Sequence, residues 1–194
     1  MRAFVLTAVL LVPAAARADS FFEAAGGLAI PVGDSNWTKN AESSPKLALR
    51  GGAIQGELGG MLGVDWTPVN LDAANGFLNP SGHRFRVLGQ FIFDHHVGPK
   101  LIVSGHAGLG IDIAHASYSY NILGVMGSGS DTDVGLAVEL GGGAWYDLGS
   151  VQIGGQLALP IGHHSKTNPP AGEFTFDYTS YDIDLLFGVR LFMR

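Results

Sequence analysis

The sequence contains no cysteine in its 194 residues. A disulfide scaffold, a thiolate metal site, a cysteine nucleophile and lipoprotein acylation are therefore all excluded. Charged residues are also scarce, at 14% of the chain, whereas soluble surfaces usually carry about 25–35%. Disorder is excluded as well, because 46% of the residues are hydrophobic. This composition argues against both a disordered tail and an ordinary water-soluble globule.

Basic residues are outnumbered by acidic ones, 11 to 17, so a nucleic-acid partner has no electrostatic basis.

One apolar run, Ala3–Val12, stands between the basic start Met1-Arg2 and Pro13. The small-x-small pattern that follows, ending at Ala18, is typical of a signal peptidase site. The run is shorter than the about 20 residues that span a bilayer. We therefore expect residues 1–18 to be a signal peptide, whose loss leaves nine basic and 17 acidic residues, a net charge of −8.

Beyond Ala18, glycines and charges interrupt every apolar stretch, so the sequence predicts no transmembrane helix in residues 19–194. The remaining structure that can span a bilayer is a closed β-barrel. Apolar and polar residues alternate with a period of two, which indicates strands. Eight strands are predicted: Phe21–Val32, Lys46–Gly56, Met61–Val69, His83–Val97, Lys100–Ala116, Thr132–Tyr146, Ser150–Gly162 and Tyr178–Met193. The second of these has the weakest alternation.

The connections between these strands alternate strictly between long and short. Three are short: Glu57–Gly60, Gly98-Pro99 and Asp147–Gly149; four are long and polar: Gly33–Pro45, Asn70–Gly82, Ser117–Asp131 and His163–Asp177. Outer-membrane barrels place short turns on the periplasmic side and longer loops outside. The sequence thus predicts one all-β domain over residues 19–194, an eight-stranded antiparallel up-and-down transmembrane β-barrel. The long loops would be available to an extracellular partner.

Which face of the strands points inward is decided by two features. The polar faces contain almost no lysine, unlike a water-facing sheet, and the aromatic residues gather near strand ends, as membrane-interface girdles do. A soluble lipid-binding barrel is the less favoured alternative. The expected girdles are Phe21, Phe22, Trp145, Tyr146 and Phe192 at one rim, and Trp66, Phe85, Tyr118, Tyr120, Tyr178 and Tyr181 at the other.

In this architecture and in its closing strand, Tyr181–Phe192, the chain resembles the small eight-stranded outer-membrane barrels of the OmpA and OmpX type. The resemblance covers residues 19–194. It implies an integral protein of the Gram-negative outer membrane, with a structural, anchoring or surface-interaction role, no enzymatic activity and no cofactor. It also implies contact with outer-membrane lipid and, during biogenesis, with the barrel-assembly machinery. Such proteins usually end on an aromatic residue, whereas this one ends Phe192-Met193-Arg194.

The strand alternation sends a set of charged side chains into the lumen. An eight-stranded barrel is just wide enough for side chains to fill it, so these charges must pair with one another. We expect a structural ion-pair plug, with a narrow gated ion pore as the alternative; a general porin is excluded by width. The set is Glu23, Arg50, Asp65, Arg84, Arg86, Asp94, Asp112, Glu139, Asp182, Asp184 and Arg190.

Seven histidines raise the question of a metal site, but the adjacent pairs His95-His96 and His163-His164 would point to opposite faces of a strand. We expect no metal site, and we expect both pairs to lie in interfacial water.

The segment around His163 also resembles the lipid A 3-O-deacylase family of outer-membrane barrels, which has a His-x-Ser pair and a downstream Glu. That resemblance implies His163 as base, Ser165 as nucleophile and Glu173 as orienting acid. Lys166 stands where that family has Asn, so we expect no hydrolase activity.

Overall fold

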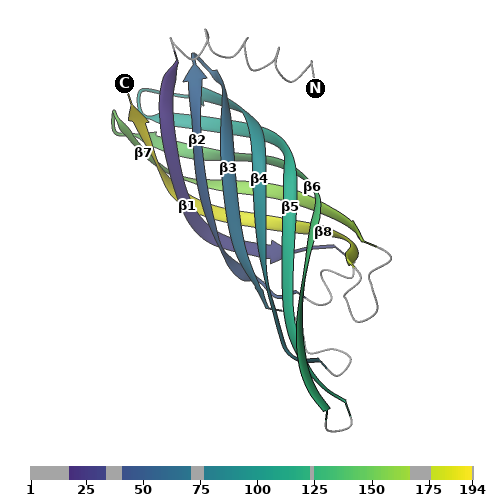
Figure 1. Cartoon of the computed structure of the whole chain (residues 1–194). Helices are drawn as coiled ribbons and strands as arrows, with labels where there is room; N and C mark the ends of the chain where they lie inside the picture. The colour runs from purple at the N-terminus through teal and green to yellow at the C-terminus, as the bar shows by residue number, and fades with distance from the viewer. Residues whose placement is uncertain (1–17, 34–40, 71–76, 123–124, 167–175, 194) are drawn as a thin grey trace, which may run out of the picture.

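In the computed structural model, eight antiparallel strands follow one another in chain order and close into a barrel (Figure 1). The structure describes residues 18–33, 41–70, 77–122, 125–166 and 176–193. Closure is made by β1, which pairs with β2 on one side and with β8 on the other. Within these residues there is no helix long and apolar enough to cross a membrane. The predicted fold class is confirmed.

All eight predicted strands are present, and several are longer than predicted, so the long connections between them are shorter. The strand bounds are β1 Asp19–Pro31, β2 Ser44–Gln55, β3 Leu58–Asn70, β4 Phe77–His96, β5 Leu101–Ile122, β6 Val125–Asp147, β7 Val151–Lys166 and β8 Phe176–Met193.

The three short turns lie at one end of the barrel, together with the start of β1 and the end of β8. The first turn falls at Gly56-Glu57, slightly earlier than predicted, so Leu58 already belongs to β3. Gly56 and Gly149 have φ of 64° and 100°, a left-handed conformation that glycine adopts without steric cost. The Asp147 carboxylate accepts a hydrogen bond from the Gly149 N–H at 2.8 Å, which fixes the third turn.

The prediction of a long polar loop over Ser117–Asp131 is wrong. Most of it forms strand: β5 continues to Ile122 and pairs with β6 as far as Val125. The start of β4 joins the same extension, since Phe77 lies opposite Tyr120, and Figure 1 shows this ribbon reaching past the other strands. Its Ser and Gly residues give no apolar alternation, because a sheet outside the barrel wall has no buried face to require one.

Side chains alternate strictly between the lumen and the outer surface. Along β2, Lys46, Ala48 and Arg50 are buried while Leu47 and Leu49 are exposed, so this strand is regular despite its weak sequence pattern. The outer surface carries the large apolar side chains: Leu62 and Leu109 are each 70% exposed.

The predicted aromatic girdle at the short-turn rim is corrected at three residues. Phe21 and Trp145 are 1% and 0% exposed and point into the lumen, and Phe192 packs against Phe21 with ring centroids 5.7 Å apart. Phe22 and Tyr146 face outward as expected, each 44% exposed. Whether an aromatic side chain points inward or outward depends on its position in the strand, because Phe21 lies on the same face of β1 as the buried Glu23.

Candidate functional site in the barrel lumen

The lumen holds the charged side chains that the sequence assigns to it. All eleven are buried, from 0% to 4% exposed. Five of the basic side chains and seven of the acidic ones that the structure describes are buried there. Buried polar side chains that the predicted network omits include Lys46, His106, His164, Gln90, Gln156 and Ser180. Lys46 has the same parity in β2 as Arg50, so counting along the strand would have found it.

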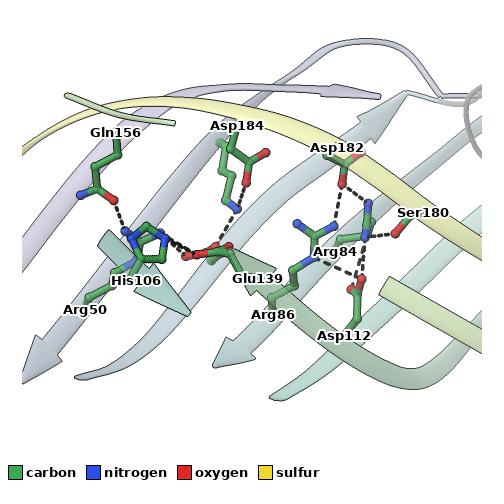
Figure 2. Close-up of polar contacts among 12 residues, drawn as sticks. Arg50, Arg84, Arg86, His106, Asp112, Glu139, Gln156, Ser180, Asp182 and Asp184 are labelled. Atoms are coloured by element: carbon green, nitrogen blue, oxygen red, sulfur yellow. Dashed lines mark hydrogen bonds and ion pairs between the residues drawn. The ribbon is translucent and has the colours of Figure 1, made fainter. Parts of the chain in front are cut away.

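At the end of the lumen nearest the long connections, two arginines from β4 meet two aspartates. Arg84 Nη2 lies 2.5 Å from Asp112 Oδ2, and Arg84 Nη1 lies 2.9 Å from Asp182 Oδ2. Arg86 reaches the same two oxygens at 3.2 and 2.6 Å. Arg84 also donates to the Ser180 hydroxyl at 2.6 Å. Figure 2 shows these guanidinium groups joining β4 to β5 and β8 across the lumen.

His164 belongs to this end of the network. Its Nδ1 lies 2.9 Å from Asp133 Oδ2, and its Nε2 lies 3.8 Å from Asp112 Oδ2. The prediction that it lies in interfacial water is therefore wrong, because an even position in β7 points inward. Its neighbour His163 is exposed on the outer surface, as a two-residue period requires.

The middle of the lumen contains three buried carboxylates, Asp65, Glu139 and Asp184, with ligand-type oxygens within 4.8 Å of one another. The Lys46 ammonium lies 2.6 Å from Asp65 Oδ2 and donates a hydrogen bond to Asp184 Oδ2. The position that a metal cation would occupy between Asp65 and Asp184 is thus filled by a side chain of the barrel itself.

Glu139 is held separately, by the side chains of Gln90, His106 and Arg50. Gln90 Nε2 donates to Glu139 Oε1 at 2.6 Å, and His106 Nε2 lies 3.2 Å from the same oxygen. Arg50 Nη2 is 3.6 Å away. These contacts come from β2, β4 and β5, so the Glu139 carboxylate on β6 ties β2, on another part of the barrel wall, to its own neighbourhood. Figure 2 shows Arg50 and His106 beside Glu139.

Nearer the short turns, Arg190 connects the ionic network to an apolar one. Its guanidinium donates to Glu23 Oε2 at 2.7 Å and to Asp94 Oδ2 at 2.8 Å. The same group stacks over the Trp145 ring, 4.0 Å from the centroid, and lies 5.4 Å from that of Phe21. Cation–π contacts of this kind are strengthened when the cation is desolvated.

The lumen beside the short turns is filled by apolar side chains, which we call the apolar plug: Phe21, Ile54, Met61 and Ile92, with Phe192 packed against them, and Trp145. Trp145 Nε1 donates to the Ser104 hydroxyl at 3.0 Å. Apart from Phe192, which is partly buried, each member of the plug is at most 8% exposed. This end of the described lumen is therefore lined by buried apolar side chains.

The structure describes two of the three residues of the rim-hydrolase resemblance, His163 and Ser165. His163 Nδ1 lies 3.1 Å from the Thr179 hydroxyl. Ser165 is exposed on the same outward face of β7. Glu173 lies outside the described residues.

No family model matches the sequence, and no curated protein matches it. Solved structures do match, at low identity. A major outer membrane protein from Thermus thermophilus is 14% identical over 91% of this chain and 99% of that one, with a TM-score of 0.60. Ail, the attachment invasion locus protein of Yersinia pestis, is 13% identical over 90% and 99%, with a TM-score of 0.55.

A third similar structure is Neisserial surface protein A, 14% identical over 89% of this chain and 96% of that one, with a TM-score of 0.53. The chain therefore has the fold of the small eight-stranded outer-membrane barrels. At these identities the likeness is one of fold.

Proposed function

We propose that this protein is an integral barrel of the Gram-negative outer membrane, with a closed lumen and no enzymatic activity, whose role is anchoring and surface interaction. The observation that carries the proposal is the inverted polarity of the barrel. Arginines, aspartates and glutamates are buried inside, while leucine, valine, isoleucine and phenylalanine side chains are exposed around the outside. Soluble monomers do not expose apolar surface on this scale, and the soluble lipid-binding alternative would need an apolar interior.

The lumen supports a structural role rather than transport. Aqueous channels occur in barrels of about 16 strands, whereas eight strands leave room for side chains alone. Here that room is filled by the ion pairs of Arg84 and Arg86 at one end and by the apolar plug at the other. Passage of an ion would require both fillings to move.

The ribbon formed by the ends of β4, β5 and β6 supports a surface-interaction role. Within the described residues, β6 pairs with β7 only from Leu136 to Asp147. Residues Val125–Gly135 pair with β5 on one side alone, and a strand edge of this kind can pair with another chain. Two of the similar structures are named for the cell surface or for attachment, which agrees with this role.

Membrane fractionation followed by gel electrophoresis with and without boiling tests the proposal. We expect the protein in the outer-membrane fraction, with a folded band that migrates differently after boiling, because closed barrels resist detergent until heated. A soluble protein that migrates at one position under both conditions would contradict it.

The hydrolase alternative is tested separately by mass spectrometry of lipid A from expressing cells, with a Ser165→Ala control. We expect no loss of an acyl chain in either.

A further inference from the structure

The outer surface of the barrel is interrupted by an apolar groove of about 790 Å³. It runs over β2, β3 and β4 towards the short-turn end. Its floor is made of Gly51, Ala53, Gly60 and Gly89, and Leu58, Leu62 and Phe91 form its walls. Ala18, the last residue of the expected signal peptide, also lines one part of it, and the residues used below all belong to the mature chain. These three wall side chains are 52%, 70% and 54% exposed. The volume lies in the range of pockets that bind small organic molecules.

The groove is not a by-product of close strand packing. A Cβ atom added to Gly51, Gly60 or Gly89 would meet nothing nearer than 3.8 Å. In the same strands, a Cβ on Gly52 or Gly59 would clash with a backbone oxygen of the neighbouring strand. The barrel therefore requires glycine at those two positions but tolerates a larger residue at the three groove positions. Because strand glycine is unfavourable relative to residues with a side chain, its presence there points to the space it leaves.

The polarity of the groove changes along its length. Its floor and walls are almost entirely apolar, and Gln55 stands at the end beside the first short turn. In the chain, Leu58 of the groove wall directly follows Glu57, whose Oε1 lies 2.8 Å from His95 Nδ1. Both side chains are about half exposed, at 50% and 55%. The His95 ring is oriented by stacking on Phe93, with an interplanar angle of 5°.

We propose that this groove holds one acyl chain of a zwitterionic phospholipid of the periplasmic leaflet, with its headgroup at Glu57 and His95. The inference rests on the proposed membrane location, which puts the outer surface in hydrocarbon and the short turns on the periplasmic side. The order of chemistry matches such a lipid: hydrocarbon along Gly60 and Leu62, then a polar rim. A carboxylate beside an imidazole complements a headgroup that carries both an ammonium and a phosphate.

The test uses the full mature barrel, delipidated and then reconstituted in nanodiscs of phosphatidylethanolamine and phosphatidylglycerol. Native mass spectrometry counts the lipids retained after transfer to detergent. We expect one retained phosphatidylethanolamine on the wild type. Gly60→Leu fills the groove and should lower that retention at least tenfold, and Gly51→Leu should act in the same direction. Glu57→Gln should remove the preference for phosphatidylethanolamine while leaving acyl-chain binding.

The matched control is Gly105→Leu. Gly105 faces outward on β5, outside the groove, and a Cβ there would meet nothing nearer than 3.9 Å, so its lipid retention should equal the wild type. A second measurement needs no variant: phosphatidylethanolamine carrying a nitroxide in its acyl chain should broaden the methyl signals of Leu58 and Leu62 more than that of Leu136, which is 69% exposed elsewhere on the surface.

Equal retention in wild type and both groove variants, or equal broadening at the three leucines, would overturn the proposal. A wild-type dimer that Gly60→Leu dissociates would assign the groove to a second copy and overturn it too. Failure of the membrane proposal is distinguishable, because the protein would then not enter nanodiscs at all. A variant that inserts and shows the heat-shifted band has folded, so its lipid count is informative.

Discussion

The two ends of the lumen are filled by opposite kinds of interaction. Towards the long connections, Arg84 and Arg86 are bound by Asp112 and Asp182. Towards the short turns, the apolar plug packs around Ile92, and Trp145 is buried. The ionic end links residues far apart in sequence, since Arg84 and Asp182 are separated by 98 positions. Each of its contacts needs a particular partner in a particular register, whereas the plug needs only apolar volume.

This difference separates two tasks. Buried ion pairs gain little net free energy, because desolvation offsets most of the Coulombic attraction. They penalise any arrangement that leaves one charge without its partner, so the ionic end specifies which strands meet and in which register. Apolar packing excludes water whatever its detailed arrangement, so we expect the plug to close the lumen to water. Arg190 joins the plug to the wider ionic network of the lumen, because it binds Glu23 and Asp94 and also stacks on Trp145.

The largest effect is expected at that junction. Arg190→Met leaves Glu23 and Asp94 buried without their shared cation, and removing one partner of a buried pair costs about 3–5 kcal/mol. Arg190→Lys keeps the charge but loses the paired donors and the stacking. Its free energy of unfolding should therefore fall less than that of Arg190→Met. Urea unfolding in lipid vesicles measures both. Equal stability of Arg190→Met and wild type would show that Arg190 does not join the apolar plug to the ionic network.

The plug is tested by Trp145→Ala. Replacing a buried tryptophan by alanine costs about 3–5 kcal/mol, and here it should also let water into the short-turn end. We expect ion conductance in planar bilayers from the variant, above a wild-type baseline near zero. Ser180→Ala is the matched control: it removes a buried polar group that contacts Arg84 at the ionic end and leaves the plug intact. Conductance from Ser180→Ala but not from Trp145→Ala would reverse the roles assigned to the two ends.

The sequence predicted the ionic end better than the plug, for a physical reason. A charge inside an alternating strand is informative wherever it stands, so Asp112 and Glu139 were assigned to the lumen directly. An aromatic residue near a strand end is ambiguous, because it suits both a membrane interface and a sealed lumen. Trp145 shares its parity with Glu139 in β6, and counting along the strand would have placed it inside.

Other features had no signal to read. The extension of β5 and β6 is rich in serine and glycine, and a strand that is exposed to water on both faces needs no apolar periodicity. Lys46 was missed because Gly51 and Gly52 blur the alternation of β2. The outer groove is defined by side chains that are absent, so its three glycines resemble the many that the barrel needs for close approach.

A smaller loss of stability is expected from a charge placed on the outer surface of the barrel. Leu109→Arg puts a charge at a position 70% exposed, and lipid-facing arginine near the midplane costs about 2–4 kcal/mol. Leu148→Arg is the matched control. Leu148 is 57% exposed but lies in the third short turn, where the cost falls to about 0–1 kcal/mol. Reversible folding from urea into vesicles compares them. A harmless Leu109→Arg would mean that this face is not in hydrocarbon.

The smallest effect on stability is expected from two surface cysteine substitutions, which report which end of the barrel faces the cell exterior. Ser128→Cys lies in the β5–β6 ribbon, the extension in which Ser117–Ile122 of β5 pair with Val125–Ser130 of β6. Leu148→Cys lies in the third short turn. Both positions lie at the surface, so each change should stay within about 0.5 kcal/mol of wild type. A membrane-impermeant thiol reagent applied to intact cells should label Ser128→Cys alone, because short turns of such barrels lie in the periplasm. The chain has no native cysteine to compete.

Both cysteine variants should label after the outer membrane is permeabilised, which controls for the reactivity of each thiol. Labelling of Leu148→Cys in intact cells would place the apolar plug at the outer mouth and the ionic end towards the periplasm. The sealed end of the lumen would then face the environment, and the β5–β6 ribbon would be out of reach of any extracellular partner.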